Sequence, residues 1–225
     1  YNDMFPSREE GINAWISIMR GCDKFCTFCI VPFTRGRERS RPIKNIINEA
    51  RDAVDNGFVE ITLLGQNVNS YNTFDGGFHD LLEKLANIDG IKRIRYTSPH
   101  PQDFNDDLLE IMSKHKNICN HIHLPLQSGS NKILQRMNRT YTREKYIQLV
   151  QKIKQYMNNY SLSTDIIVGF PGENHQEFCE TLEVVKEVKF DFSYMFKYSS
   201  RPGTKAAEFT DQIPESVKQE RLEEL

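Results

Sequence analysis

Short apolar segments typical of β-strands alternate with amphipathic segments typical of helices along the whole of this 225-residue chain. The expected strands are residues 14–18, 59–65, 91–96, 121–126, 165–168 and 192–198. The expected helices cover residues 43–54, 78–88, the region of 108–112, 142–156 and 174–188, with Thr142 and Asn174 as N-caps. Strands that alternate with helices in this way predict an α/β fold with a parallel sheet.

The number of repeats narrows the fold further. About six strand–helix units are fewer than the eight of a closed barrel, so we expect an open, partial (β/α)6 barrel of the TIM type. Polar and glycine-rich segments follow the expected strands at their carboxyl ends, which predicts a functional site on that rim. A doubly wound open sheet remains the alternative, because periodicity alone does not separate the two.

Three cysteines, Cys22, Cys26 and Cys29, follow the first expected strand at C-x3-C-x2-C spacing, and no fourth cysteine or histidine lies nearby in the sequence. A cubane iron–sulfur cluster normally takes four cysteines, so three would leave one iron open to a substrate or cofactor. The alternatives are a zinc site completed by a remote ligand and a group of surface thiols. Cys119 and Cys179 stand alone and are expected to be small buried apolar residues.

Charge and hydropathy limit the function and the location of the chain. The net charge is −2 and the pI about 6.4, so the chain as a whole does not have the basic character of a nucleic-acid-binding protein. No apolar run of membrane-spanning length and no signal segment is present, which favours a cytoplasmic location. The chain begins with Tyr and stops inside a helical pattern, so we expect it to belong to a longer protein.

Two smaller patterns have both a functional and a structural explanation. Arginines occupy alternate positions from Arg35 to Arg41, and an extended backbone would place all four on one face, where they could contact phosphates. A solvated charge run is the equal alternative. His121 and His123 share one side of an expected strand, and we expect packed, hydrogen-bonded histidines rather than metal ligands.

Four segments carry a resemblance to a known family: residues 21–41, 64–71, 123–130 and 169–173. They resemble the radical S-adenosylmethionine (SAM) core of the methylthiotransferases, and the resemblance extends over essentially the whole chain. It implies that residues 1–225 form one radical SAM core domain, without the N-terminal methylthiotransferase domain and the C-terminal TRAM domain of that family.

Within the family, residues 65–71 and 198–204 look like the branch that modifies transfer RNA. The branch that modifies an aspartate of a ribosomal protein tends to carry acidic residues where Arg201 and Pro202 stand here. The branch acting on threonylcarbamoyl-adenosine lacks the Gln-Asn-Val-Asn pattern. The resemblance therefore implies a transferase that methylthiolates C2 of isopentenyladenosine next to the anticodon. The alternatives are the same chemistry on the ribosomal protein and, outside enzymes, a zinc-stabilised RNA-binding module.

The resemblance also implies the cofactors. Cys22, Cys26 and Cys29 would hold a [4Fe–4S] cluster whose open iron chelates SAM, which is cleaved to methionine and a 5′-deoxyadenosyl radical. A second cluster is expected on the N-terminal domain of the family. This chain alone should therefore bind SAM without completing the methylthiolation.

Seven further residues are implied as SAM contacts: Phe28, Gln66, Gln127, Ser128, Arg139, Arg143 and Val168. Gln66 would orient the methionyl amino group through its amide oxygen, and Arg139 or Arg143 would pair with the methionyl carboxylate.

The remaining contacts would hold the adenosine part of SAM. Gln127 and Ser128 would bind the ribose hydroxyls, Phe28 would lie against the adenine, and Val168 with the following glycine turn would bring backbone close to it. Asp165 is as readily a hydrogen-bonded strand residue as a cofactor contact.

The expected partners follow from the same family. Arg35, Arg37 and Arg201 are the candidates for touching the transfer RNA. An electron donor such as a flavodoxin or a ferredoxin is expected, and neither a membrane nor DNA is.

Overall fold

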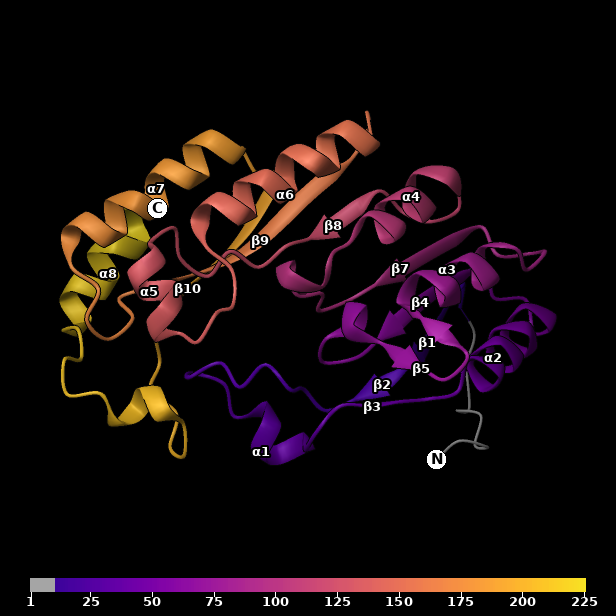
Figure 1. Ribbon diagram of the computed structural model, residues 1–225, viewed down its shortest axis with the longest axis horizontal. Coiled ribbons are helices and arrows are strands. Elements are labelled where there is room, and N and C mark those ends of the chain that lie inside the picture. The colour runs from indigo at the N-terminus through magenta and orange to yellow at the C-terminus, as the bar shows by residue number, and fades with distance from the viewer. Residues whose placement is uncertain (1–10) are drawn as a thin grey trace. The chain divides into compact units, whose positions relative to one another are not determined.

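The computed structural model describes residues 11–225, which divide into two compact units. The first unit holds residues up to 22 together with residues 35–121, and the second holds residues 23–34 and 122–225. Each unit is built on a three-stranded sheet of its own, and the two are labelled along the chain in Figure 1. No helix in the described part of the chain is long and apolar enough to cross a membrane.

The sheet of the first unit has the order β1-β4-β7 and is parallel throughout. Its strands are β1 (Asn13–Ser17), β4 (Glu60–Leu64) and β7 (Arg93–Tyr96). The helices are α2 (Ile43–Asp55), α3 (Phe78–Ala86) and α4 (Asp106–Lys114), with 3-10 turns η1 (Val68–Ser70) and η2 (Pro101–Asp103). Two short antiparallel pairs complete it: β2 (Met19–Arg20) with β3 (Arg39–Ser40), and β5 (Asn72–Thr73) with β6 (Gly76–Gly77).

Side-chain periodicity explains how this unit packs. Helix α2 turns the apolar residues Ile46, Ala50 and Ala53 inward, and all three are fully buried. Strands β1 and β7 alternate buried and exposed positions, as expected for strands with one covered face. Strand β4 lies between them and is buried on both faces over most of its length, because it is the central strand.

The sheet of the second unit has the order β10-β9-β8. Its strands are β8 (His121–His123), β9 (Ser161–Val168) and β10 (Phe192–Lys197). The helices are α1 (Val31–Arg35), α5 (Asn131–Arg136), α6 (Arg143–Tyr156), α7 (His175–Val188) and α8 (Glu215–Glu224), with the 3-10 turn η3 (Lys205–Glu208).

One face of this second sheet is covered by helices. Ile166 and Val168 of β9 form a buried cluster with Phe178 of α7, and Leu222 of α8 packs against the same cluster. Figure 1 shows α6 and α7 on the same side of β9. The opposite face of β9 carries Ser163, Asp165 and Ile167, and Ile167 packs against the cluster around Ile133 and Tyr198.

All six expected strands are present, and the order of the strands decides between the two expected folds. Within each unit, neighbouring strands follow one another along the chain. A parallel bridge joins Ile94 of β7 to Ile118, so the segment leading into β8 runs beside β7. A doubly wound sheet would instead return that segment to β1. The partial-barrel prediction is therefore favoured over the doubly wound alternative.

The expected helix caps are also confirmed. The Thr142 hydroxyl accepts a hydrogen bond from the Lys145 backbone N–H at 3.3 Å. Asn174 and Glu177 form a reciprocal capping box, in which each side chain accepts the backbone N–H of the other, at 3.0 and 2.6 Å.

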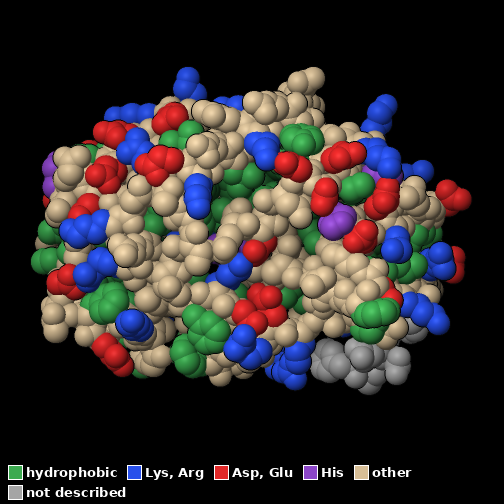
Figure 2. All heavy atoms as spheres, viewed as in Figure 1, with side chains coloured by type: hydrophobic (Ala, Val, Ile, Leu, Met, Phe, Trp, Pro, Cys, Tyr) green, Lys and Arg blue, Asp and Glu red, His purple; other side chains and the backbone are tan. Residues whose placement is uncertain are grey.

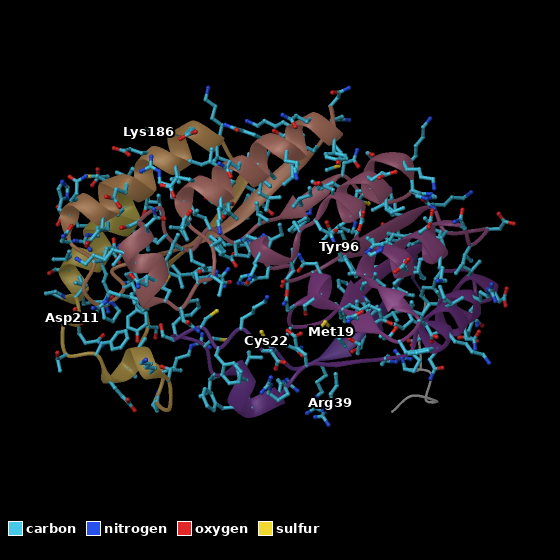
Figure 3. The ribbon with its side chains drawn as sticks, viewed as in Figure 1. Met19, Cys22, Arg39, Tyr96, Lys186 and Asp211 are labelled. Carbon is cyan, nitrogen blue, oxygen red and sulfur yellow. The ribbon has the colours of Figure 1, made fainter. Side chains whose placement is uncertain are left out.

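The prediction of an extended backbone that places the four arginines from Arg35 to Arg41 on one face is wrong. Residues 31–35 form α1, so Arg35 ends a helix, and only two residues of the stretch lie in a strand. The Arg41 guanidinium binds the Ser17 carbonyl at 2.6 Å and the Glu49 carboxylate at 2.8 Å, which makes it a structural residue. Arg39 is exposed, and its side chain points away from the ribbon in Figure 3.

The expected burial of the two remaining cysteines is also wrong. Cys119 and Cys179 are both half-buried free thiols. The sulfur of Cys179 lies 3.5 Å from His175 Nε2 on the exposed side of α7, one helical turn away.

Candidate functional site

The cysteine loop begins in the first unit, where Gly21 sets its direction. Gly21 has a φ of 87°, a backbone conformation that glycine adopts readily and other residues rarely do. Its N–H donates to the Gln66 side-chain oxygen at 2.7 Å, and the next N–H, of Cys22, donates to the Gly36 carbonyl at 3.2 Å. Gln66 thus ties the end of β4 to the residue before Cys22, which Figure 3 labels on the loop beyond Met19.

The rest of the loop belongs to the second unit. Cys26 and Cys29 are joined by a turn in which the Cys29 N–H donates to the Cys26 carbonyl at 3.0 Å. Phe25 has a φ of 48°, and the Asn138 side chain stabilises this turn by donating to the carbonyls of Lys24 and Phe25 at 3.2 and 2.9 Å. The two thiols are therefore presented by a loop that the segment after α5 holds in place.

Arg139 places a positive charge beside one of these thiols. Its Nη1 lies 3.3 Å from the Cys26 sulfur, and its Nε donates to the Tyr141 hydroxyl at 3.0 Å. Tyr141 is anchored in turn, because its hydroxyl donates to the Pro125 and Leu126 carbonyls at 2.8 and 2.9 Å. A guanidinium fixed in this way stabilises negative charge on sulfur, as a metal-bound thiolate requires.

Burial raises the pKa of the Cys29 thiol above its usual value, against a hydrogen bond at the Val31 backbone that lowers it. The charge of Cys26 raises the same pKa, whereas Arg201 and Arg139 lower it. Arg201, one of the expected RNA contacts, is therefore close enough to Cys29 to act on it electrostatically.

Cys22, Cys26 and Cys29 offer three thiol groups, the ligand type of an iron–sulfur cluster. All three cysteines of the loop are free thiols and half-buried. Cys26 and Cys29 line a cavity of about 480 Å³ together with the aromatic residues Phe25, Phe33 and Phe209. Across residues 11–225, no three His, Cys, Asp or Glu side chains converge closely enough to enclose a single metal ion.

The polar segment after β4 forms a network within the first unit. The Asn69 side chain both donates to the His100 carbonyl at 2.9 Å and accepts the His100 N–H at 2.7 Å. Asn67 donates to Asp103 at 2.8 Å. Asn67, Asn69 and His100 are all buried, so they join the ends of β4 and β7 rather than lining an open site. Sequence analysis gave these asparagines no role of their own.

Gln127 and Ser128, the expected ribose ligands, differ in whether their side chains are already hydrogen-bonded within the protein. Gln127 has a φ of 65° and a buried side-chain oxygen with no hydrogen-bond partner among the described residues. Ser128 is 1% exposed; its oxygen accepts the Ser130 N–H at 3.2 Å and lies 3.4 Å from the Thr181 hydroxyl of α7. Gln127 therefore retains an unused acceptor, whereas Ser128 is engaged inside the unit.

A buried carboxylate holds the glycine turn after β9. One Glu173 oxygen accepts the N–H groups of Gly169 and Phe170 at 2.7 and 3.1 Å, and Arg221 Nη1 lies 3.3 Å from the other. Burial raises the pKa of Glu173 to about 7, although Arg221 and the two backbone N–H groups oppose the rise. Val168, before this turn, is buried and its carbonyl accepts the Tyr198 N–H at 2.9 Å. Sequence analysis missed both Glu173 and Arg221, since their contact spans 48 residues.

Phe28 packs near the same turn. Its ring meets Phe170 edge-on, with the centroids 6.4 Å apart, and both belong to the cluster around Ile133 and Tyr198. Arg143 differs from Arg139, because its guanidinium binds Glu183 of α7 at 3.0 Å. Its assignment to SAM stays a prediction without support from the geometry.

The two strand histidines have different surroundings. His123 is hydrogen-bonded, as expected: its Nε2 lies 3.2 Å from Asp165 Oδ2 and its Nδ1 lies 3.0 Å from the Ser163 hydroxyl. His121 is exposed, so the expectation that it would be packed is wrong. Asp165 is therefore within hydrogen-bonding distance of a histidine in the neighbouring strand.

The expected RNA contacts are all at the surface. Arg35, Arg37 and Arg201 are exposed side chains. Figure 2 shows lysine, arginine and acidic side chains interspersed over the visible face, in keeping with the net charge of −2. Basic recognition of phosphate would therefore have to be local.

Comparison with known families identifies the class of protein. The model of the Radical SAM superfamily matches residues 16–185, which include the end of β1, the cysteine loop, the strands from β2 to β9 and most of α7. The chain belongs to this superfamily. Membership implies a [4Fe–4S] cluster and SAM as its cofactors, which confirms the cofactors expected from the sequence.

The curated relatives indicate which enzymes of the superfamily the chain is most similar to in sequence. The chain is 52% identical over 221 residues to tRNA-2-methylthio-N(6)-dimethylallyladenosine synthase of Carboxydothermus hydrogenoformans, covering 97% of this chain and 50% of the relative. It is 53% identical over 220 residues to the protein of the same name from Bdellovibrio bacteriovorus, covering 97% and 49%. These are MiaB enzymes, the branch that residues 65–71 and 198–204 resemble. The chain spans about half the length of the curated relatives it matches.

Solved structures support the fold alone. The radical SAM methyltransferase TsrM from Kitasatospora setae superposes with a TM-score of 0.70 at 14% identity, over 86% of this chain and 38% of that one. Coproporphyrinogen III oxidase (HemN) from Escherichia coli, also a radical SAM enzyme, gives 0.64 at 18% identity, over 94% and 51%. The predicted fold class, a partial TIM-like radical SAM core, is confirmed.

Proposed function

We propose that residues 1–225 serve as the radical SAM core of a methylthiotransferase that acts on C2 of N6-dimethylallyladenosine in transfer RNA. The observation that carries this proposal is the 52% identity to a synthase of that name over 97% of the chain. Identity at this level spans the cysteine loop and the strand ends, where a radical SAM enzyme does its chemistry.

In this proposal Cys22, Cys26 and Cys29 hold the cluster. When bound, the cluster supplies the electron that cleaves SAM into methionine and the 5′-deoxyadenosyl radical. Arg139 stabilises the charge on the Cys26 sulfur from 3.3 Å, and Gln66 fixes the backbone just before Cys22.

The second unit supplies the groups for the adenosine part of SAM. The unpartnered oxygen of Gln127 suits a ribose hydroxyl, which donates a hydrogen bond. Val168 and the turn held by Glu173 offer backbone groups to the adenine, and Phe28 offers its ring. Gln66 is proposed for the methionyl amino group through the second lone pair of the oxygen that already accepts the Gly21 N–H.

The partners in this proposal are transfer RNA and a one-electron donor of the flavodoxin or ferredoxin type. Arg35, Arg37 and Arg201 would contact RNA phosphates, so binding would weaken with salt. Ser128 and Arg143 already have protein partners, and their contacts with SAM stay predictions.

The test is methylthiolation by the complete natural protein with its cluster reconstituted anaerobically. The substrates are an anticodon stem–loop that contains N6-dimethylallyladenosine and a ribosomal protein with a target aspartate. Mass spectrometry of the products should show a methylthio group on the RNA alone, and none with Cys26→Ala. Modification of the ribosomal protein instead, or of neither substrate, would overturn the proposal.

A further inference from the structure

One face of the second unit's sheet, opposite to Ile166 and Val168, carries Ser163, Asp165 and Ile167 of β9. In the β9–β10 register Tyr194 lies beside Asp165, Phe192 beside Ser163 and Phe196 beside Ile167. Neighbouring residues of a parallel sheet share a face. The helices pack on the other face, through Ile166 and Val168.

Three aromatic rings of β10 lie on this face. Phe192, Tyr194 and Phe196 are 55%, 51% and 52% exposed, although strand residues of this size are normally covered. Phe192 and Tyr194 meet edge-on with their centroids 4.7 Å apart. Over these five residues the strand rises about 13 Å, so the rings form an apolar wall along it.

A hydrogen-bonding group lies beside the wall. His123 meets the Tyr194 ring edge-on, with the centroids 6.0 Å apart, and its Nε2 is 3.2 Å from Asp165 Oδ2. The Asp165 side chain is 28% exposed, and its contact with His123 is made through Oδ2, the oxygen other than Oδ1. An apolar wall with one oriented carboxylate acceptor suits a flat ligand with an N–H donor next to an apolar substituent.

We propose that this face, formed by His123, Asp165, Phe192, Tyr194 and Phe196, binds the target base of the RNA, a purine with an apolar substituent on N6. The inference rests on the proposed function and adds the residues that would select the base. The N6–H donates to Asp165 Oδ1, which His123 holds in position from the other oxygen. The N6 substituent packs on Phe192 and Tyr194.

The orientation follows from the direction of the strands. Phe192 begins β10 and Phe196 lies near its carboxyl end, the end at which the glycine turn after β9 lies. With the substituent toward Phe192, the rest of the base extends toward the end of the sheet where the SAM residues gather. Unpaired bases in RNA are commonly stacked on aromatic side chains in the same manner.

The experiment measures the dissociation constants of two anticodon stem–loops that differ only in the N6-dimethylallyl group. The complete natural protein with its cluster is used, as wild type, F192A/Y194A, Asp165→Asn and Met195→Ala. Met195 is the matched control, since it lies on the same strand with its side chain on the opposite face and is 40% exposed. Iron content and thermal unfolding confirm that each variant is folded.

The wild type should prefer the dimethylallyl RNA, and F192A/Y194A should reduce that preference about tenfold or more, because a few buried methylenes give discrimination of this size. Asp165→Asn should weaken the binding of both RNAs alike, since both carry the N6–H. Met195→Ala should change neither dissociation constant. If F192A/Y194A keeps the preference for the dimethylallyl RNA while the wild type methylthiolates that RNA, the inference about this face is wrong and the proposed function stands. A wild type that leaves the RNA unmodified overturns the proposed function instead.

Discussion

Glu173 shows how one buried side chain can link the stability of the fold to pH. Its carboxylate is 3% exposed and holds the turn after β9, and burial raises its pKa to about 7. The folded state therefore binds the Glu173 proton more tightly than the unfolded state does, where the pKa is near its usual value of 4.5. The stabilisation from this proton is complete below about pH 4.5 and is lost as the pH rises through 7.

Between pH 4.5 and 7.5 the free energy of unfolding of the wild type should fall, relative to that of Glu173→Gln, by roughly 3 kcal/mol. Glutamine keeps an acceptor for the Gly169 and Phe170 N–H groups but does not titrate. Urea unfolding of both proteins across this pH range measures the difference. A difference that stays constant with pH would show that Glu173 is ionised throughout.

Arg139 and Arg143 lie close together in the sequence but make different contacts, so substitutions at the two positions can be compared directly. Arg139 lies 3.3 Å from the Cys26 sulfur, whereas Arg143 binds Glu183. Removing a positive charge and a hydrogen bond from a cluster sulfur lowers the reduction potential of the cluster. Arg139→Gln should therefore shift the potential of the reconstituted cluster to more negative values, and Arg143→Gln should leave it in place.

Potentiometric titration followed by electron paramagnetic resonance measures both variants against the wild type. Equal potentials in all three proteins would mean that Arg139 leaves the sulfur when the cluster binds. Iron content serves as the control for cluster occupancy.

At the scale of elements, the turn into the cysteine loop depends on a glycine. Gly21 and Gly57 both have positive φ values, 87° and 90°. An added Cβ at Gly21 would collide with the carbonyl oxygens of Gly36 and Arg37, whereas at Gly57 it would meet nothing within 4 Å. Both alanine variants carry backbone strain, which costs about 1–2 kcal/mol, but only one also displaces its neighbours.

Gly21→Ala should therefore lose most of its iron on reconstitution, because the backbone of Cys22 moves with the turn. Gly57→Ala should keep a normal iron content at a slightly lower unfolding temperature. Iron and sulfide analysis with thermal unfolding distinguishes the two. Full iron in Gly21→Ala would show that the loop tolerates the shift.

Elements with a long periodic pattern were predictable from the sequence. The stripes of α2, α6 and α7 and the caps at Thr142 and Asn174 repeat within a few residues, so local rules are sufficient. Helix α1 has five residues and no such stripe, and it was missed; the alternate arginines that continue from it then suggested a strand. The three aromatics of β10 had a usable signal, because alternate positions on a strand share a face.

At the scale of the whole molecule, the positions of the cysteines could be predicted and their surroundings could not. The contacts between Gly21 and Gln66 and between Arg139 and Cys26 span 45 and 113 residues. Such pairs depend on the packing of the strands, which no local pattern encodes. The same applies to Asp165, whose partner His123 lies on the neighbouring strand.

We propose that Cys22, Cys26 and Cys29 hold a cluster with one iron open to SAM. Iron analysis of the anaerobically reconstituted protein, with electron paramagnetic resonance of the reduced sample with and without SAM, tests it most directly. We expect about four irons per chain for this cluster and a spectrum that SAM alters and that Cys26→Ala abolishes. One tightly bound zinc, no iron and no response to SAM would contradict the account and return the cysteines to a structural role.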